Sequence, residues 1–134
     1  PVALIVRRGH PLMHRPGIVA QDLLEFDWVM PEADVPITRT VLTRLHALGL
    51  PRPQQRLSTA SFLLTLALLQ QTNAIAPLAV AVADAFAKAP DAPYAQLPLD
   101  LGIVVEPFGL MTRAGVALPP AARYLADTIL SVSA

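Results

Sequence analysis

The chain has 134 residues, of which 54% are hydrophobic and 15% are charged. This length is enough for one domain with a substantial core, and the composition excludes a disordered protein. Ten basic residues balance ten acidic residues, so the chain lacks the basic excess of a domain that binds nucleic acid by itself.

The cysteine content, the apolar runs and the N-terminus further limit the class of protein. The absence of cysteine excludes disulfides and thiolate chemistry and fits a reducing compartment. Polar residues at 70–73 and Asp84 interrupt the apolar runs, so no run is long enough to cross a bilayer. The N-terminus has neither a signal-peptide pattern nor an initiator methionine. We therefore expect a cytoplasmic location and a chain that is part of a longer protein.

The first predicted element is a buried strand. Residues 1–6 form a continuous apolar run that is typical of a strand covered on both faces. His10 and His14 follow at a helical spacing, but Pro11 and Pro16 disfavour a helix there, and no carboxylate or cysteine completes a metal-ligand set. We therefore expect surface histidines and no metal.

The next segments predict strands that alternate with helices. A short helix is expected over 18–26 and a short buried strand over 28–30. Apolar residues at helical spacing predict a helix over 36–48, which begins with a proline and ends before Gly49. A brief strand is then expected over 56–58.

The most distinctive stretch is the apolar segment 62–69. Its apolar residues lie on every side of a helical wheel, so we expect this helix to lie inside the protein. Ser58, Thr59 and Ser61 place hydroxyl groups at its start, where a helix leaves backbone N–H groups unpaired. A helix start between two strands of a parallel sheet can bind a ligand, and the alternative is that these hydroxyls only cap the helix.

The C-terminal part predicts four more strands and two more helices. A short buried strand is expected over 73–76, and Pro77 is expected to open a helix that runs to residue 88. Strands are expected over 94–97, 99–105 and 108–112. The apolar inner stripe of a final helix is expected to consist of Ala121, Leu125, Thr128, Ile129 and Val132.

This order of elements predicts an α/β fold, a Rossmann-like parallel sheet with helices on both faces. The hydroxyl groups at 58–61 lack a nearby His–Asp arrangement, and no glycine-rich phosphate loop is present. We therefore expect no enzyme activity and no cofactor.

Several local patterns follow one another along the chain. They are GHPL at 9–12, DLLEFDWVM at 22–30, a proline-to-glycine helix at 36–49, NAIAP at 73–77, FGLMTR at 108–113 and LPPAAR at 118–123. In this order they resemble the effector-binding domain of LysR-type transcriptional regulators. Two positions depart from the family pattern: Asn73 stands where Asp is common, and Pro119 where Ser often caps the last helix.

The resemblance implies a fold like that of type 2 periplasmic binding proteins, with one complete subdomain and part of a second. Residues 1–15 are then the crossing strand and a remnant of the first subdomain. Residues 16–101 form the second subdomain, and residues 102–134 are the return strand and closing helix of the first. The winged helix-turn-helix through which the family binds DNA has no counterpart in this chain.

The resemblance also implies a small polar or anionic effector in the cleft between the subdomains. The turn at 58–61 and the loop at 31–38 would contribute to it. The expected effector-binding residues are Ser58, Thr59, Ser61, Thr38, Pro31, Pro77 and Leu78. A carboxylate of Glu32 or Asp34 in the cleft would repel an acidic effector, and the alternative is that Asp34 caps the following helix and faces solvent.

Self-association is expected, because the strand at 1–6 is apolar on both faces and only the last helix could cover the remnant of the first subdomain. Two other classes remain open. A periplasmic-type solute-binding protein shares the fold and the cleft, and an export signal would favour it. An enzyme on the same scaffold requires catalytic residues that the sequence does not offer.

Overall fold

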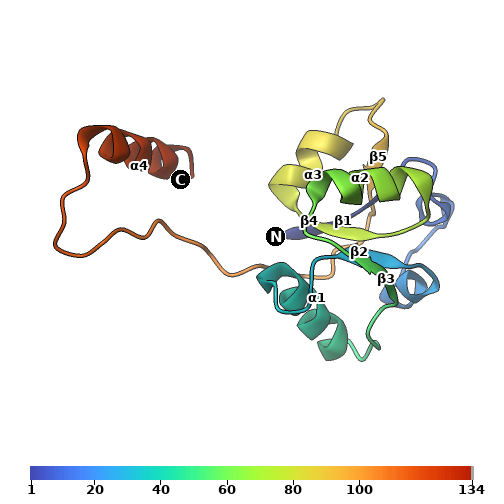
Figure 1. Cartoon of the computed structure of the whole chain (residues 1–134). Helices are drawn as coiled ribbons and strands as arrows, with labels where there is room; N and C mark the ends of the chain where they lie inside the picture. Colours follow the sequence, from blue (N-terminus) through green and yellow to red (C-terminus); the bar gives the residue numbers. More distant parts are fainter. Residues whose placement is uncertain (134) are drawn as a thin grey trace.

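The computed structural model describes residues 1–133, without the side chains of residues 55 and 56. A packed α/β body is followed by a long segment without regular secondary structure and then by a separate helix (Figure 1). In chain order the elements are β1 (Val2–Arg7), the 3-10 helices η1 (Pro11–His14) and η2 (Ala20–Glu25), β2 (Trp28–Met30), α1 (Pro36–Ala47), β3 (Gln55–Ser58), α2 (Phe62–Gln71), β4 (Ala76–Ala79), α3 (Val80–Ala87), β5 (Tyr94–Gln96) and α4 (Pro120–Val132).

The strands lie side by side in the order β3-β2-β4-β1-β5. β1 pairs antiparallel with β4 and β5, β2 pairs parallel with β3, and a parallel bridge between Trp28 and Ile75 joins the two parts. The four strands after β1 therefore run in one direction, and β1 runs against them. The prediction of a wholly parallel sheet is wrong at β1, because an apolar run indicates burial on both faces but not direction.

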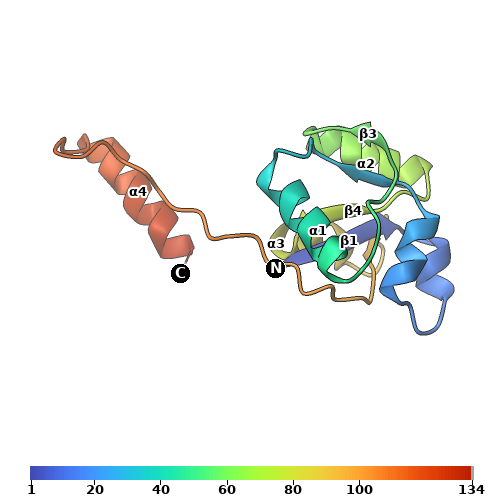
Figure 2. The same ribbon diagram turned by 90° about the horizontal axis from the view of Figure 1, so that it is seen from below.

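Helices cover both faces of this sheet (Figures 1 and 2). Val2, Leu4 and Val6 of β1 join a core cluster that includes residues of α1, whereas Ala3 and Ile5 join a second cluster with residues of α2 and α3. Successive side chains of a strand point to opposite faces, so β1 contributes to both cores.

α1 begins with a proline and ends at a glycine, as predicted. Gly49 has a φ of 74°, the left-handed conformation that favours glycine. Its N–H donates to the carbonyl oxygen of His46 at 2.9 Å, and the N–H of Leu50 donates to that of Leu45 at 3.0 Å. This is a Schellman motif, and the buried side chain of Leu50 completes it.

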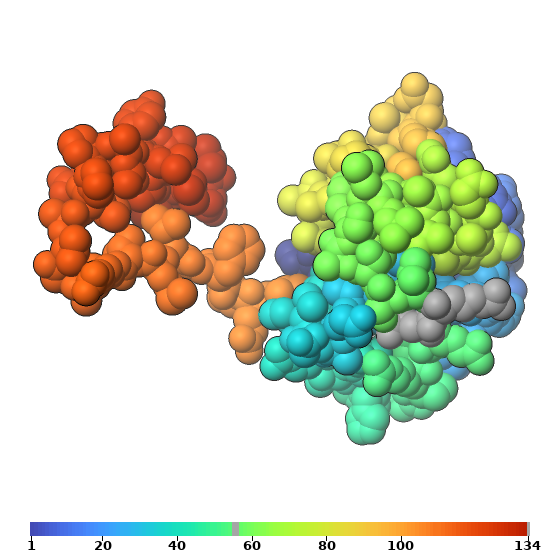
Figure 3. Space-filling model, in the orientation of Figure 1, coloured from blue at the N-terminus to red at the C-terminus, as the bar shows by residue number. Residues whose placement is uncertain are grey.

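α2 lies at the surface, so the prediction of an interior helix is wrong. Leu66 and Leu69 are buried against the sheet, but Leu63 is 78% exposed, and Phe62 and Leu64 are exposed as well. The start of this helix is visible on the front of the molecule (Figure 3). A helix that is apolar all round can cover one sheet face and still leave its outer face without a partner.

The helix predicted to start at Pro77 starts three residues later. Pro77 lies within β4, where it is buried and pairs with Leu4, and α3 begins at Val80. The fixed φ of proline suits an extended strand as well as the first turn of a helix, so the residue alone does not separate the two cases.

The segment after Ile103 differs most from the predicted structure. Residues 99–105 and 108–112 form no strand; the N–H of Val2 in β1 donates to the carbonyl oxygen of Ile103, but this single bond does not make a ladder. α4 forms over the predicted residues but lies away from the body (Figures 1 and 3). Its predicted inner stripe is exposed, and on this helix only Ala126 is buried among residues 120–132.

Candidate functional site

Four of the residues predicted to bind an effector meet where β2 and β3 end. Ser58 lies opposite Met30 in the parallel pair, and the N–H of Thr59 donates to the carbonyl oxygen of Met30 at 3.1 Å. The hydroxyl of Thr38 donates to the carbonyl oxygen of Pro31 at 3.1 Å. The start of α1 and the turn before α2 are therefore held at the same edge of the sheet, where the carboxyl ends of parallel strands commonly bind ligands.

The hydroxyls of Thr59 and Ser61 cap the start of α2. Ser61 is the N-cap, and its Oγ accepts from the N–H of Leu64 at 3.2 Å. The Oγ1 of Thr59 accepts from the N–H of Ser61 at 3.0 Å. In both bonds the hydroxyl oxygen is the acceptor, so neither bond uses the O–H donor of these side chains. Capping the helix and donating to a ligand are therefore compatible roles.

Thr38 is fully buried, and its O–H already donates to Pro31. This threonine shapes the loop at 31–38 instead of presenting its hydroxyl at the surface. The loop itself carries Glu32 and Asp34 as exposed residues. The guanidinium of Arg39 donates to the backbone carbonyl oxygen of Asp34 at 3.0 Å and so places a cation beside this loop.

Pro77 and Leu78 lie inside the sheet. Pro77 is buried, and Leu78 packs half-buried against the core cluster on the α2 and α3 face. They follow Ile75, which bridges to Trp28, and so belong to the strand beside β2. The expectation that Pro77 starts a helix beside the ligand is wrong.

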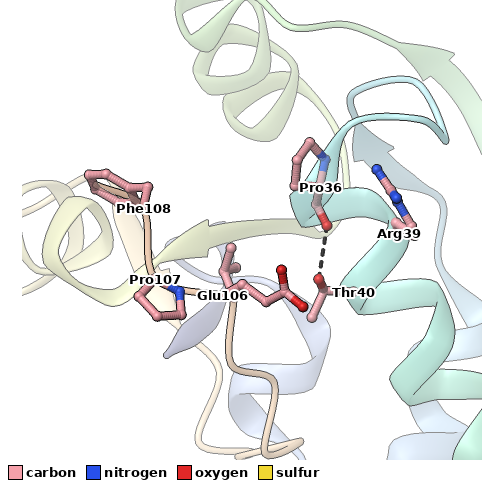
Figure 4. Close-up of a pocket in the computed structure, with 7 residues that line it drawn as sticks. Pro36, Arg39, Thr40, Glu106, Pro107 and Phe108 are labelled. Atoms are coloured by element: carbon pink, nitrogen blue, oxygen red, sulfur yellow. Dashed lines mark hydrogen bonds between the residues drawn. The ribbon is translucent and has the colours of Figure 1, made fainter. Parts of the chain in front are cut away.

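A hollow of about 410 Å³ adjoins the first turn of α1 (Figure 4). Its lining residues come from α1 and from the segment after Ile103. They are Pro36, Arg39, Thr40, Val105, Glu106, Pro107 and Phe108. Arg39 follows Pro36 by three residues on α1, and this helical spacing places both beside the hollow.

His10 is fully buried, so its assignment as a surface histidine is wrong. Its Nε2 lies 2.9 Å from the carbonyl oxygen of Asn73, its Nδ1 accepts from the N–H of Leu12, and its ring packs on Phe26. Burial lowers the pKa of His10, the Asn73 bond opposes this, and the charge of Arg7 lowers the pKa further. His10 is a structural histidine that caps η1.

The described residues were also compared with the requirements of a metal site and of a membrane-spanning helix. Within residues 1–133, no group of three or more His, Asp or Glu side chains is arranged to hold a metal ion. No helix in the same range has the length and hydropathy needed to span a bilayer.

Comparison with protein families assigns the chain to one class of domain. The whole chain, residues 1–134, matches the model of the LysR substrate binding domain. The chain belongs to this family of substrate-binding domains, which have a periplasmic-binding-protein-like fold and occur in regulators of transcription.

Three characterised relatives are named as regulators. The HTH-type transcriptional regulator GbpR of Rhizobium radiobacter is 41% identical over 60% of this chain, a match that covers 27% of that protein. GbpR of Azospirillum brasilense is 27% identical over 91% of this chain and 35% of its own length. GalR of Pseudomonas putida is 28% identical over 98% of this chain and 32% of its own length. The chain therefore spans about a third of the relatives that it matches.

Proposed function

We propose that this domain controls the DNA binding of a longer, cytoplasmic LysR-type regulator by binding a small polar or anionic metabolite. Family membership and the names of the three relatives support the regulatory role. The zero formal charge argues against DNA contact by residues 1–134 themselves, and the names of the HTH-type relatives support contact through a winged helix-turn-helix of the longer regulator. A fluorescence anisotropy titration with duplex DNA at low salt should show no tight binding by this chain.

The chain divides, in this proposal, into a Rossmann-like second subdomain over 16–101 and two pieces of the first subdomain, 1–15 and 102–134. The N–H of Val2 donates to the carbonyl oxygen of Ile103 at 2.9 Å, so the chain enters and leaves the body at one point. A chain that crosses from one subdomain to the other and back needs two connecting segments that lie next to each other. The exposed apolar residues of α4 support its role as a part of the first subdomain.

The effector site lies, in this proposal, at the joined ends of β2 and β3. The observation that carries it is the bond between Thr59 and Met30, which sets the hydroxyls before α2 beside the loop at 31–38. The O–H groups of Thr59 and Ser61 would donate to a carboxylate, sulfonate or hydroxyl of the effector, aided by the positive end of α2. Ser58, Pro31 and Leu78 would form its walls, with Thr38 and Pro77 behind them.

Calorimetry on this chain and on the longer regulator, with a panel of small acids and sugars, tests the site. Thr59→Ala should weaken binding about tenfold or more, because a lost hydrogen bond to a charged group is worth roughly 1.5–3 kcal/mol. Thr59→Ser keeps the O–H and should bind like the parent. Ser131→Ala, on α4, is the matched control. Equal affinities for Thr59→Ala and the parent would assign these hydroxyls to helix capping alone.

Self-association is the second part of the proposal. Leu63 on α2 is 78% exposed, and Leu125, Ile129 and Val132 form an exposed apolar stripe on α4. Such faces commonly bind a second copy of the same chain. Light scattering after size exclusion should show a dimer or a larger assembly, and Leu63→Gln should shift it toward the monomer. A clean monomer of the parent at tens of micromolar would contradict this part.

A further inference from the structure

Arg44, in the last turns of α1, reaches the segment through which the chain leaves the body. Its Nε donates to the backbone carbonyl oxygen of Leu101 at 2.6 Å, in a partly buried position. A hydrogen bond from a guanidinium is shorter and stronger than one between neutral groups. This contact joins α1 to the segment 100–103. The two bonded residues are 57 positions apart in the sequence.

The backbone of residues 100–103 is shaped around this guanidinium. Gly102 has a φ of 65°, and a Cβ atom at Gly102 would lie only 3.2 Å from a terminal nitrogen of Arg44. The N–H of Gly102 donates to the side chain of Asp100 at 2.7 Å, while Leu101 and Ile103 are buried. Glycine thus allows both the backbone turn and the close approach of Arg44.

The N-terminal end of the same helix contacts the loop at 31–38. Thr38, in the first turn of α1, bonds to Pro31 at the end of β2, and Arg44 lies six residues further along the helix. A helix moves as a stiff unit over this distance. Displacement of the loop at 31–38 would therefore displace α1 and, through Arg44, Leu101. The displacement of Leu101 would then move Ile103, whose backbone is bonded to that of Val2.

We propose that Arg44 is a positioning residue that couples the loop at 31–38 to the two segments that cross out of the body at Val2 and Ile103. The link between Arg44 and the crossing segments stands on its own contacts. Its role in relaying a bound effector rests on the site proposed above. The tests below use no ligand, so their outcome is independent of whether that site binds an effector.

Hydrogen exchange of the whole chain, read at the amides of Val2 and Gly102, tests the link. Arg44→Met keeps the aliphatic stem but removes the donor, and both amides should exchange at least about threefold faster while amides of α2 and β4 stay unchanged. Arg44→Lys keeps a donor and should lie between Arg44→Met and the parent. His46→Gln, an exposed position of the same helix that makes no contact with the loop at 31–38, is the control and should leave both amides unchanged.

A double-mutant cycle tests the coupling. Thr38→Val removes the bond to Pro31 and should speed exchange at Val2 and Gly102 in the parent, but add nothing in the Arg44→Met background. Additive effects of the two changes would overturn the coupling. Unchanged exchange at Val2 and Gly102 in Arg44→Met, or an equal rise in every segment of the chain, would overturn the link itself.

Discussion

The Nε2 atom of His10 lies 2.9 Å from the backbone carbonyl oxygen of Asn73, so the imidazole donates its proton there. The other ring nitrogen, Nδ1, accepts from the N–H of Leu12 and must therefore carry no proton. The fold thus binds the neutral ring in one tautomer. The side chain of Asn73 adds to the link, because its Oδ1 accepts two bonds from Arg7.

The free energy of unfolding should decrease as the pH falls through the ordinary histidine pKa of 6.5. Burial lowers the pKa of His10 in the folded chain, so below pH 6.5 the unfolded chain binds a proton that the folded chain lacks. The loss is at most about 1.4 kcal/mol per pH unit and ends at the folded-state pKa. Above 6.5 the contribution of His10 is fully present. Urea unfolding between about pH 5 and pH 8 measures this.

His14 provides the control for the pH experiment, because it lies in the same short helix and is exposed. His14→Gln should reproduce the pH profile of the parent. A free energy of unfolding that stays constant below pH 6.5 in the parent would contradict the role given to His10.

Gly49→Ala should reduce the free energy of unfolding by about 1–2 kcal/mol, since Gly49 has a φ of 74° that an L-residue adopts with strain. No atom lies near its Cβ position, so the effect is one of backbone conformation and not of a clash. Gly109→Ala is the matched control, with an ordinary φ and open space, and should stay within about 0.5 kcal/mol. Equal urea midpoints for the two variants would contradict this prediction.

Ser61→Ala should reduce the free energy of unfolding by about 1 kcal/mol, because it removes the oxygen that accepts from Leu64 at the start of α2. Ser61→Asn supplies another capping oxygen and should restore most of the loss. Thermal unfolding of the three proteins by circular dichroism measures both effects. The prediction fails if Ser61→Ala and Ser61→Asn unfold at the same temperature.

Truncation of two leucines of α2 should have very different effects on the free energy of unfolding. Leu69 is fully buried, so Leu69→Ala should reduce the free energy of unfolding by about 2–5 kcal/mol. Leu63 is 78% exposed, so Leu63→Ala should change it by no more than about 0.5 kcal/mol in dilute solution. Urea unfolding of both variants makes the comparison. A large loss for Leu63→Ala would mean that its outer face is already covered in the parent.

The sequence predicted elements with strong local signals. α1 was predictable because Pro36 and Gly49 mark its ends and its apolar residues recur at helical spacing. The family resemblance placed the turn at 58–61 with the loop at 31–38, and the contacts of Ser58 and Thr59 with the end of β2 agree with it. His10 was not predictable, since its burial depends on Asn73, which is distant in the sequence.

Other incorrect predictions also concern features that depend on distant residues or on other parts of the protein. The direction of β1 depends on β4 and β5, and no residue of β1 encodes it. The outer face of α2 and the stripe of α4 are apolar without being covered in this chain, so hydrophobicity predicted burial that a single copy does not provide. The contact between Arg44 and Leu101 was not predictable, because three strands separate the two residues along the chain.

The central place of β1 has a consequence for how the chain folds. Ile5 pairs with both Ala76 and Gln96, so the middle of the sheet forms only after nearly the whole body has been synthesised. Contacts of such high sequence separation slow folding, because their loop-closure entropy is lost before the contacts form. Until β4 and then β5 have been synthesised, the edges of β1 stay unpaired, which makes the nascent chain prone to aggregation.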